Sequence, residues 1–472
     1  MNSQLRAHAL SIFAAGVQAV TPQRLFADKV KIEASVLTID DHVVIDLSKY
    51  TRIVVVGAGK AAAGMAKELY RQQLSRLSHP LTGWINAPAG SFRDGDAGPN
   101  IRLHAARPAG LNEPTEAAVF GTQQILKLVG ECTARDLVIV LLSGGGSALL
   151  VAPPDGVTLQ DKQAVAQLIA ASGGNIEQLN CVRRALSEVK GGGLTRACRA
   201  GRMVSLIISD VLDDSLQTIA SGPTLLTANR NASEALLVLE QLGLSREPRL
   251  HNVGNYLRRA SSGNLSNIHR PLPSVEHVIL ANNATAVDAA GTRAVELGYR
   301  YLMQSARTSE GEVGVLARHL SGAIEQLLGQ REVDCLISGG EPTVLLPEAS
   351  QRGIGGRNQQ LALSIMESLR KLGWPSSSGR FSRPFVFLSG GTDGEDGPTT
   401  AAGAMFDAET LHRAIAADIS LADHLLRADA YSFFKRVGGL IETGPTNTNV
   451  CDLRICLAQL LSHDCSNRSC DN

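Results

Sequence analysis

A run of apolar residues that ends in Ser-Gly-Gly occurs three times in the chain, at residues 142–145, 337–340 and 388–391. Each apolar run has the length and composition of a buried strand. The glycines that follow allow a sharp turn and let backbone N–H groups approach a ligand closely. Because the three copies are irregularly spaced, they do not indicate a solenoid. Buried strands that lead through tight turns into helices predict an α/β fold.

The composition agrees with an α/β enzyme of more than one domain. The 472 residues exceed one ordinary core, so two or three domains are expected. Glycine is abundant, at 46 residues, while aromatic residues make up only 4%, which favours an α/β fold over a β-sandwich. A polar stretch rich in turn formers at 256–274 is the predicted linker between an N-terminal domain at 1–255 and a C-terminal domain at 275–472.

The charge balance gives no reason to expect nucleic acid or an anionic membrane as a partner, since Lys+Arg and Asp+Glu both total 45. The first 22 residues predict an amphipathic helix and contain no apolar stretch able to cross a bilayer. The eight cysteines include no CxxC pair, so neither a zinc site nor a disulfide framework is expected. We therefore predict a cytoplasmic protein, with a mitochondrial location as the alternative, and leave a homodimer open.

The first glycine turn, Gly57-Ala58-Gly59-Lys60, follows a predicted strand at 53–56 and precedes a predicted helix at 61–73. Free N–H groups at a helix start, with Lys60 beside them, form the outline of an anion site. The same residues satisfy a relaxed dinucleotide fingerprint, but the next predicted strand, near 84–86, ends without the acidic residue that would hold a ribose. A strand-to-helix turn without a ligand is the third alternative.

The second glycine turn, Ser-Gly-Gly-Gly-Ser at 143–147, suits a nest of backbone N–H groups around phosphate oxygens. It is not a hydrolase elbow, because Ser147 lacks a glycine two positions later, and it lacks the lysine of a Walker A loop. A plain tight turn is the alternative.

Two charged residues follow this turn along the chain. Asp210 comes just after a predicted strand at 204–208, where open α/β sheets bind their ligands, so it is a catalytic candidate. Lys190 ends a predicted helix at 180–190, and a solvated helix face is the alternative to a binding role for it.

Three carboxylates, Asp393, Glu395 and Asp396, crowd the turn after the predicted strand at 385–388. Such groups repel one another unless a cation lies among them, so we expect Mg²⁺ at Asp393 and Asp396. Phosphates would supply the remaining ligands, and metal binding should therefore be weak without a nucleotide. A polar surface turn is the alternative.

Together the strand ends offer backbone donors, the cations Lys60 and Arg357, and several carboxylates, which is the inventory that phosphoryl transfer needs. None of the eleven histidines lies in these loops, which argues against hydride transfer to a hydroxy acid. A non-catalytic sensor of a sugar acid or nucleotide is disfavoured, because it gains nothing from three acids facing its ligand.

The chain resembles the glycerate 2-kinases of the MOFRL type (DUF4147/MOFRL), which are sometimes described as hydroxypyruvate reductases. The resemblance runs from about residue 9 to residue 452 and rests on ordered motifs that include VVVGAGKAAAGMA, LLSGGGSALL, LISGGEPTV, GGRNQQLALS and LSGGTDGEDGPTTAAGA. It implies a Rossmann-like three-layer N-terminal domain, a smaller α/β C-terminal domain and an active site in the cleft between them. It also implies ATP- and Mg²⁺-dependent phosphorylation of D-glycerate to 2-phosphoglycerate. An NAD(P)H-dependent hydroxypyruvate reductase is the alternative.

The resemblance implies catalytic roles for Lys60, Arg357, Asp210 and Asp393. The implied substrate- and ATP-binding residues are Gly57, Gly59, Ser143, Gly144, Gly145, Gly146, Ser147, Lys190, Ser338, Gly339, Gly340, Glu341, Gly356, Ser389, Gly390, Gly391, Thr446 and Asn449. The chain departs from the family at 105–108, where it reads Ala-Ala-Arg-Pro and Ala-Gly-His-Pro is usual. It departs again at 428–431, where Asn-Asp-Ser-Tyr is usual.

Overall fold

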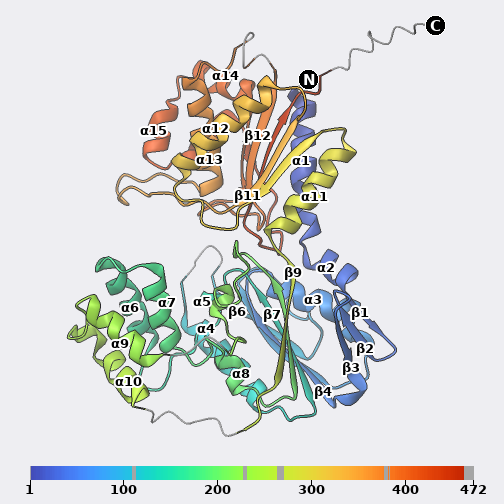
Figure 1. Cartoon of the computed structure of the whole chain (residues 1–472), viewed down its shortest axis with the longest axis vertical. Coiled ribbons are helices and arrows are strands. Elements are labelled where there is room, and N and C mark those ends of the chain that lie inside the picture. The colour runs from blue at the N-terminus through green and yellow to red at the C-terminus, as the bar shows by residue number, and fades with distance from the viewer. Residues whose placement is uncertain are drawn as a thin grey trace. The chain divides into compact units, whose positions relative to one another are not determined.

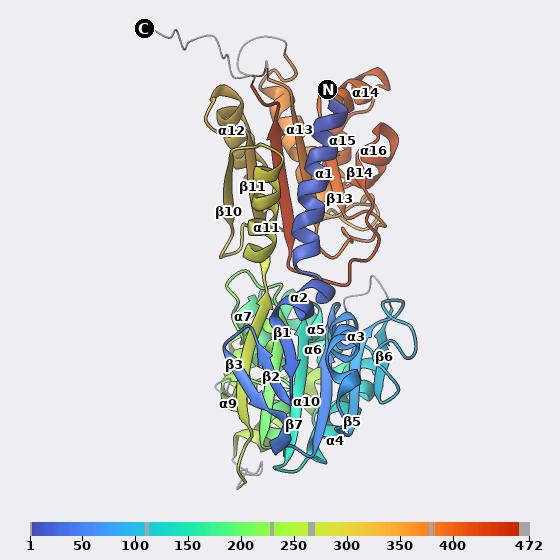
Figure 2. The same cartoon turned by 90° about the vertical axis from the view of Figure 1, so that its right-hand side faces the viewer.

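The computed structural model describes residues 2–108, 113–226, 231–262, 270–376, 381 and 383–461. Contacts divide the chain into two units, which are shown in two views in Figures 1 and 2. The N-terminal unit comprises Thr21–Asn282 with Asn447–Asn449, and the C-terminal unit comprises Met1–Val20, Asn283–Thr446 and Val450–Asn472. Each unit contains a six-stranded sheet with helices, so the predicted α/β class is confirmed.

A parallel sheet forms the centre of the N-terminal unit. Its strands lie in the order β6-β5-β4-β7-β8-β9, and every neighbouring pair is parallel. This is the order of a doubly wound Rossmann fold, which reverses direction at its centre, here between β4 and β7. All eight residues of β7 are buried, which explains its unbroken apolar run. The strands are β4 (Arg52–Ala58), β5 (Leu81–Pro88), β6 (Ile101–Arg107), β7 (Asp136–Ser143), β8 (Arg202–Ile208) and β9 (Ser274–Ala281).

Helices pack against this sheet in two apolar clusters. One cluster joins α4, α5 and α8 to the face of the sheet that carries Val54 and Val56, while α3 contacts β4, β5 and β7. A separate cluster joins α6, α7, α9 and α10 to one another. A small antiparallel sheet, ordered β1-β2-β3, and α2 complete the unit. The remaining bounds are α2 (Pro22–Lys29), β1 (Val30–Glu33), β2 (Val36–Ile39), β3 (Val43–Asp46), α3 (Ala62–Gln72), α4 (Glu116–Gly130), α5 (Gly146–Leu149), α6 (Leu159–Ala171), α7 (Ile176–Ala185), α8 (Gly193–Ala197), α9 (Ala232–Gln241) and α10 (His251–Ser261), with short 3-10 turns η1 (Leu47–Lys49), η2 (Leu74–Arg76), η3 (Ile219–Ser221) and η4 (Pro248–Leu250).

The sheet of the C-terminal unit is mixed and has the order β10-β11-β15-β12-β13-β14. Only β10 and β11 pair in parallel. One face packs on α1 and α11, and the other face packs on α12, α13, α14 and α16. The bounds are α1 (Asn2–Ala19), α11 (Asn283–Glu296), β10 (Tyr301–Ser305), α12 (Val313–Gly329), β11 (Cys335–Gly340), α13 (Arg357–Lys371), β12 (Phe385–Gly391), β13 (Gly403–Phe406), α14 (Ala408–Ala416), α15 (Leu421–Leu426), α16 (Ala430–Val437), β14 (Leu440–Ile441) and β15 (Asp452–Ala458).

The two units differ from the predicted domains at 1–255 and 275–472 in two places, the first helix and the boundary between the domains. Helix α1 belongs to the C-terminal unit, where it lies beside α11 in both views and buries Ile12 and Phe13 (Figures 1 and 2). Strand β9, which we assigned to the start of the second domain, completes the N-terminal sheet by pairing with β8. Parallel strands such as β8 and β9 can be joined only by a long crossover connection, so the segment between them belongs to the same unit as both strands. The division between the units therefore falls after Asn282.

No helix among the described residues combines the length and the apolar character that a membrane crossing requires.

Candidate active site

Two glycine turns meet where the strand order of the N-terminal sheet reverses. The turn after β4 and the turn after β7 lie side by side, because the backbone N–H of Lys60 donates to the Gly144 carbonyl at 2.8 Å. The N–H of Ala61 donates to Ser143 Oγ at 2.9 Å. Gly59 has φ +145°, and a Cβ there would overlap Ser143 Oγ, so only glycine permits this approach. The sheet thus brings the predicted residues of both turns together at the position where doubly wound folds bind ligands.

The Gly144–Gly146 turn is surrounded by charged and amide side chains. A Cβ at Gly144 would overlap Asp210 Oδ2 and Asn449 Nδ2, and Asn449 Nδ2 itself donates to Asp210 Oδ2 at 3.2 Å. Asp210 lies two residues after the end of β8, close to the strand end where it was predicted. The absence of a side chain at Gly144 therefore lets Asp210 and Asn449 lie directly against the backbone of the turn.

Two cations lie beside the same turn. A Cβ at Gly145 would lie 3.1 Å from Arg107 Nη2 and 3.5 Å from Lys60 Cγ. Arg107, the last residue of β6, is buried and stands where the resemblance leads one to expect histidine. Arg107 was not among the predicted site residues, because the departure from the family at 105–108 indicates only that a histidine is missing there. The turn thus has positive charge available for an anionic ligand from two separate strand ends.

Lys190 is buried, which excludes the solvated helix face that the sequence left open. Helix α7 ends at Ala185, five residues before the predicted end, and the chain then turns inward. Lys190 Nζ donates to the Ser147 carbonyl at 2.9 Å, and Ser147 Oγ lies 2.8 Å from Ser221 Oγ. Burial lowers the pKa of Lys190 well below its usual value, and the nearby cations Lys162 and Arg183 lower it further.

In the C-terminal unit, the other two Ser-Gly-Gly copies flank one buried carboxylate. Strands β11 and β12 both pair with β15, and the register sets Gly340 and Gly391 opposite Asp452 on its two sides. Asp452 is fully buried at the first position of β15. The glycine pairs therefore end beside a charge that the sequence did not single out.

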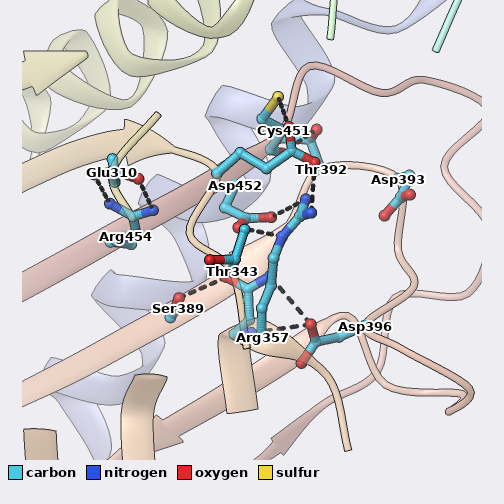
Figure 3. Close-up of polar contacts among 12 residues, drawn as sticks. Glu310, Thr343, Arg357, Ser389, Thr392, Asp393, Asp396, Cys451, Asp452 and Arg454 are labelled. Atoms are coloured by element: carbon cyan, nitrogen blue, oxygen red, sulfur yellow. Dashed lines mark hydrogen bonds and ion pairs between the residues drawn. The ribbon is translucent and has the colours of Figure 1, made fainter. Parts of the chain in front are cut away.

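Arg357, at the start of α13, neutralises this carboxylate (Figure 3). Its Nε and Nη2 contact the two oxygens of Asp452 at 2.7 and 3.0 Å, and its Nη1 contacts Glu341 Oε1 at 2.5 Å. Burial by itself would lower the pKa of Arg357, but Asp452 and then Glu341 raise it above its usual value. The side chain remains 32% exposed, so Arg357 is a permanent cation that keeps access to solvent.

The acidic turn does not hold three carboxylates facing one another. Asp396 points to the start of α13, away from Asp393 (Figure 3). Its Oδ1 accepts from the N–H of Asn358 at 3.0 Å, and its Oδ2 accepts from the N–H of Gln359 at 2.8 Å. Burial raises the pKa of Asp396 to about 7, although these N–H donors act in the opposite direction. Asp396 thus caps a helix, a role that differs from the Mg²⁺ ligand that we expected.

Asp393 and Glu395 remain on the turn itself. The N–H of Glu395 donates to Asp393 Oδ1 at 3.1 Å. Thr446 is tied to the same turn, since its N–H donates to the Asp393 carbonyl at 3.2 Å and its Oγ1 donates to the Thr392 carbonyl at 2.7 Å. Within the part of the chain that the structure describes, no three His, Cys, Asp or Glu side chains gather closely enough to form a metal site by themselves.

A second buried ion pair, which was not predicted, lies near Asp452 on β15. Arg454 lies two residues along β15, is fully buried, and contacts both oxygens of Glu310 at 2.8 and 2.6 Å (Figure 3). The sequence contains an indication of this pair, because charged residues in the apolar strand that begins Asp-Leu-Arg must find partners inside the protein. Asn358, whose Oδ1 accepts from Ser389 Oγ at 2.6 Å, was missed because it lies next to the more conspicuous arginine.

The remaining predicted residues lie on the strand ends already described. Gly57 lies in β4, where a Cβ would overlap the Leu141 carbonyl, so its role is close packing of β4 on β7. Ser338 and Gly339 lie just before Gly340, the last residue of β11, and Gly390 precedes the last residue of β12. Gly356 immediately precedes α13, and a Cβ there would overlap Asp396. Gly57 and Gly356 therefore allow neighbouring segments of the chain to pack closely.

Comparisons with known proteins agree with this two-part architecture. A model of a domain of unknown function (DUF4147) matches residues 8–258, and a model of the MOFRL family matches residues 334–452. Glycerate kinase of Danio rerio is 33% identical, with 96% of this chain and 98% of that protein covered. Glycerate kinase of Bos taurus is 37% identical, with 85% and 83% covered.

A solved structure resembles the whole chain. The crystal structure of a glycerate kinase from Thermotoga maritima has a TM-score of 0.76 and 30% sequence identity, with 97% of this chain and 100% of that chain covered. The two family models and these relatives together span nearly the full length of the sequence. The chain therefore belongs to the DUF4147 and MOFRL families, together with these glycerate kinases.

Proposed function

We propose that the protein is a glycerate kinase, which transfers the terminal phosphoryl group of ATP to the 2-hydroxyl of D-glycerate. The observation that carries this proposal is the Gly144–Gly146 turn, which lies at the reversal point of the sheet with Lys60, Arg107 and Asp210 around it. Backbone donors and fixed cations at such a position stabilise the charge that spreads over a transferring phosphoryl group. The names of the relatives support the same activity.

The reaction breaks the bond between the terminal phosphorus and its bridging oxygen and forms a new bond to the glycerate oxygen. The hydroxyl proton must pass to a base, and ADP leaves with the bridging oxygen. Asp210 and Asp393 are the two candidates for this base and for a metal ligand. Lys60 is suited to the phosphoryl group or to the glycerate carboxylate. Arg357 keeps solvent access and a fixed positive charge, which suits it to transition-state charge.

Mg²⁺ would supply charge neutralisation of the ATP phosphates when bound. The carboxylates fit a nucleotide-borne ion better than a tight protein site, since no three metal-ligating side chains gather within the described residues and Asp396 is engaged by α13. The expectation that the residues of both units act in one cleft stays a prediction.

A dinucleotide site has less support. Strand β5, which would have to carry the ribose-binding acid near its end, reads Leu-Thr-Gly-Trp-Ile-Asn-Ala-Pro and contains no acidic residue. Its one long polar side chain, Asn86, is buried and donates to the Leu149 carbonyl at 2.8 Å. NADH-dependent reduction of hydroxypyruvate is therefore the control reaction that we expect to be absent.

The test is turnover of ATP with D-glycerate, followed by chromatography against authentic 2- and 3-phosphoglycerate. We expect 2-phosphoglycerate, and Lys60→Met should lower kcat by about 10²–10³-fold, the usual cost of losing one group that stabilises transition-state charge. Lys127→Met is the matched control, because Lys127 is an exposed lysine of α4 whose side chain is 69% exposed. Normal turnover by Lys60→Met, or a 3-phosphoglycerate product, would contradict the proposal.

Two further proposals concern the setting of the enzyme. The six cysteines within the described residues are all free and buried, which supports a reducing compartment and hence the cytoplasm. A homodimer stays a prediction.

A further inference from the structure

Two successive residues of the 3-10 turn η3, Ala220 and Ser221, hold a left-handed backbone that side chains rarely adopt. Their φ angles are +49° and +64°, and Gly222 follows with φ +59°. A Cβ makes this conformation costly, because it comes too close to the neighbouring carbonyl oxygen, whereas glycine adopts it freely. A serine at position 221 therefore lowers stability where a glycine would not.

Among the described residues, two other pairs of successive non-glycine residues have positive φ, and both lie in hairpins. Residues 34–35 connect β1 to β2, and residues 40–41 lie between β2 and β3. Positive φ is typical of tight hairpin turns, because it matches the twist of the two strands. Residues 220–221 lie between β8 and α9 and belong to no hairpin. Their left-handed backbone therefore requires another explanation.

Both strained residues lie against the glycine turn that follows β7. A Cβ at Gly146 would lie only 2.9 Å from the Cβ of Ala220, so η3 and this turn are in close contact. Ser221 Oγ lies 2.8 Å from Oγ of Ser147, the residue directly after the turn. Since φ sets the direction of the Cα–Cβ bond relative to the preceding residue, the left-handed backbone directs the Ser221 hydroxyl at Ser147.

A second glycine turn holds the strained segment from its other side. The N–H of Gly191 donates to the Ser221 carbonyl at 3.0 Å, and the N–H of Gly192 donates to the Gly222 carbonyl at 2.7 Å. Strained backbone persists only where the surrounding structure fixes it, and these two hydrogen bonds do so. The segment is therefore fixed between two turns.

We propose that Ser221 is a positioning residue, whose hydroxyl fixes the side chain of Ser147 and thereby the end of the Gly144–Gly146 turn. It acts through Ser147 and needs no contact with the substrate. Backbone strain is found at functional sites where it presets the geometry of reacting groups, and a small misplacement there slows the reaction. The kinetic part of this inference rests on the proposed function, whereas the ordering of the turn does not.

The kinetic test compares two substitutions of Ser221. Ser221→Gly removes the hydroxyl and relieves the strain, and we expect kcat with ATP and D-glycerate to fall by about 10–100-fold with KM for ATP nearly unchanged. Ser221→Ala removes the same hydroxyl but keeps the strain, so it should show the same fall in kcat and a Tm about 2–4 °C below that of Ser221→Gly. A purely structural role would instead preserve kcat in the more stable variant.

Ser35→Gly is the matched control. Ser35 also follows an alanine with positive φ, but it is exposed in the hairpin between β1 and β2. This substitution relieves the same kind of strain away from the glycine turn, so kcat and KM should both stay at their wild-type values.

Hydrogen exchange of the full-length protein, followed by mass spectrometry, gives a readout that needs no turnover. The N–H of Ala148 donates to the Gly145 carbonyl at 3.2 Å, and the N–H of Leu150 donates to the Gly146 carbonyl at 2.8 Å. If the Ser221 hydroxyl orders the end of the turn, these N–H groups should exchange about 10-fold faster in Ser221→Gly than in the wild type, because local opening becomes easier. Ser35→Gly should exchange as the wild type does.

The outcomes separate the two proposals. If the wild type phosphorylates glycerate and Ser221→Gly keeps the wild-type kcat, the positioning role is wrong and the function stands. If the wild type forms no phosphoglycerate but exchange at Ala148 and Leu150 becomes faster only in the Ser221 variants, the function fails and the ordering of the turn stands. If Ser221→Gly and Ser35→Gly lower kcat equally, the effect is not specific to Ser221 and the inference is overturned.

Discussion

Removing either partner of the ion pair between Arg357 and Asp452 should lower the free energy of unfolding, but by different amounts. Asp452 is fully buried, while the side chain of Arg357 is 32% exposed and has a second partner in Glu341. Arg357→Met therefore leaves a carboxylate without water or a counter-charge, and we expect a loss of about 3–5 kcal/mol in the free energy of unfolding. Asp452→Asn leaves a cation that can still reach solvent and Glu341, so the loss should be about 1.5–3 kcal/mol.

The double variant Arg357→Met/Asp452→Asn gives the decisive comparison. Once the arginine is gone, removing the buried charge of Asp452 relieves the penalty, so the double variant should be more stable than Arg357→Met alone. Simple additivity would instead place it below both single variants.

The assay is urea unfolding followed by the fluorescence of Trp374, which is buried in the C-terminal unit against Phe385 and Phe406. The chain has two tryptophans, so a Trp84→Phe background makes the signal report this unit alone. If Asp452→Asn destabilises the Arg357→Met protein further, the argument that the buried carboxylate dominates the pair is refuted. Loss of kcat in Arg357→Met must be interpreted together with this loss of stability.

The other predictions concern a helix cap, a glycine turn and a metal. The pKa of Asp396 is about 7 in the folded unit against 3.8 for an ordinary Asp, so the folded state binds this proton more tightly than the unfolded state. The free energy of unfolding should therefore be greatest below about pH 4 and should fall as the pH rises towards 7. Asp396→Asn should remove this dependence in urea titrations at pH 5 and pH 8. Gly144→Ala places a Cβ on the carboxylate of Asp210 and should lower kcat by at least about 10²-fold, because a catalytic group is displaced. Calorimetry should detect Mg²⁺ weakly without nucleotide and more tightly with ADP, and Asp393→Asn should lower turnover more than Glu395→Gln.

Each of these three predictions has a control variant or an outcome that would contradict it. Gly322→Ala, in the middle of α12 with open space around the new Cβ, should stabilise the protein by about 0.5–1 kcal/mol and leave kcat unchanged. If Gly144→Ala behaves in the same way, the crowding argument at Asp210 fails. If the pH dependence survives in Asp396→Asn, another group carries it. Equal losses in the two acidic-turn variants would remove the distinction between their carboxylates.

Local sequence patterns predicted the strand ends well because apolar runs and glycine pairs act over a few residues. The turns at Gly59 and Gly144 could be identified as an anion site since both follow buried strands, and a parallel sheet sets such ends along one edge. Their exact neighbours could not be predicted in the same way. Asn449 reaches the turn from a distant part of the sequence, and Arg107 was visible only as a missing histidine.

The acidic turn shows why sequence proximity misled. Asp393 and Asp396 are three positions apart, but Gly394 and Gly397 adopt φ of +84° and +64°, which redirects the chain between and after them. Asp396 then finds the N–H groups of α13, a helix whose approach depends on tertiary packing. The burial of Lys190 and of the charges on β15 also depends on tertiary packing. Hydropathy along the chain does not indicate which polar side chains will find a partner in the folded protein.

Because α1 belongs to the C-terminal unit, the order of synthesis affects when this helix can pack. This helix leaves the ribosome before any strand of the sheet on which it packs, since β12 and β15 lie near the other end of the sequence. The apolar face that carries Ile12 and Phe13 must stay unassembled while the whole N-terminal unit is synthesised. Such long-range contacts slow folding, so we expect the C-terminal unit to form late and in one step. A circular permutant in which α1 follows β15 should therefore fold faster and aggregate less during synthesis, although its folded contacts are unchanged.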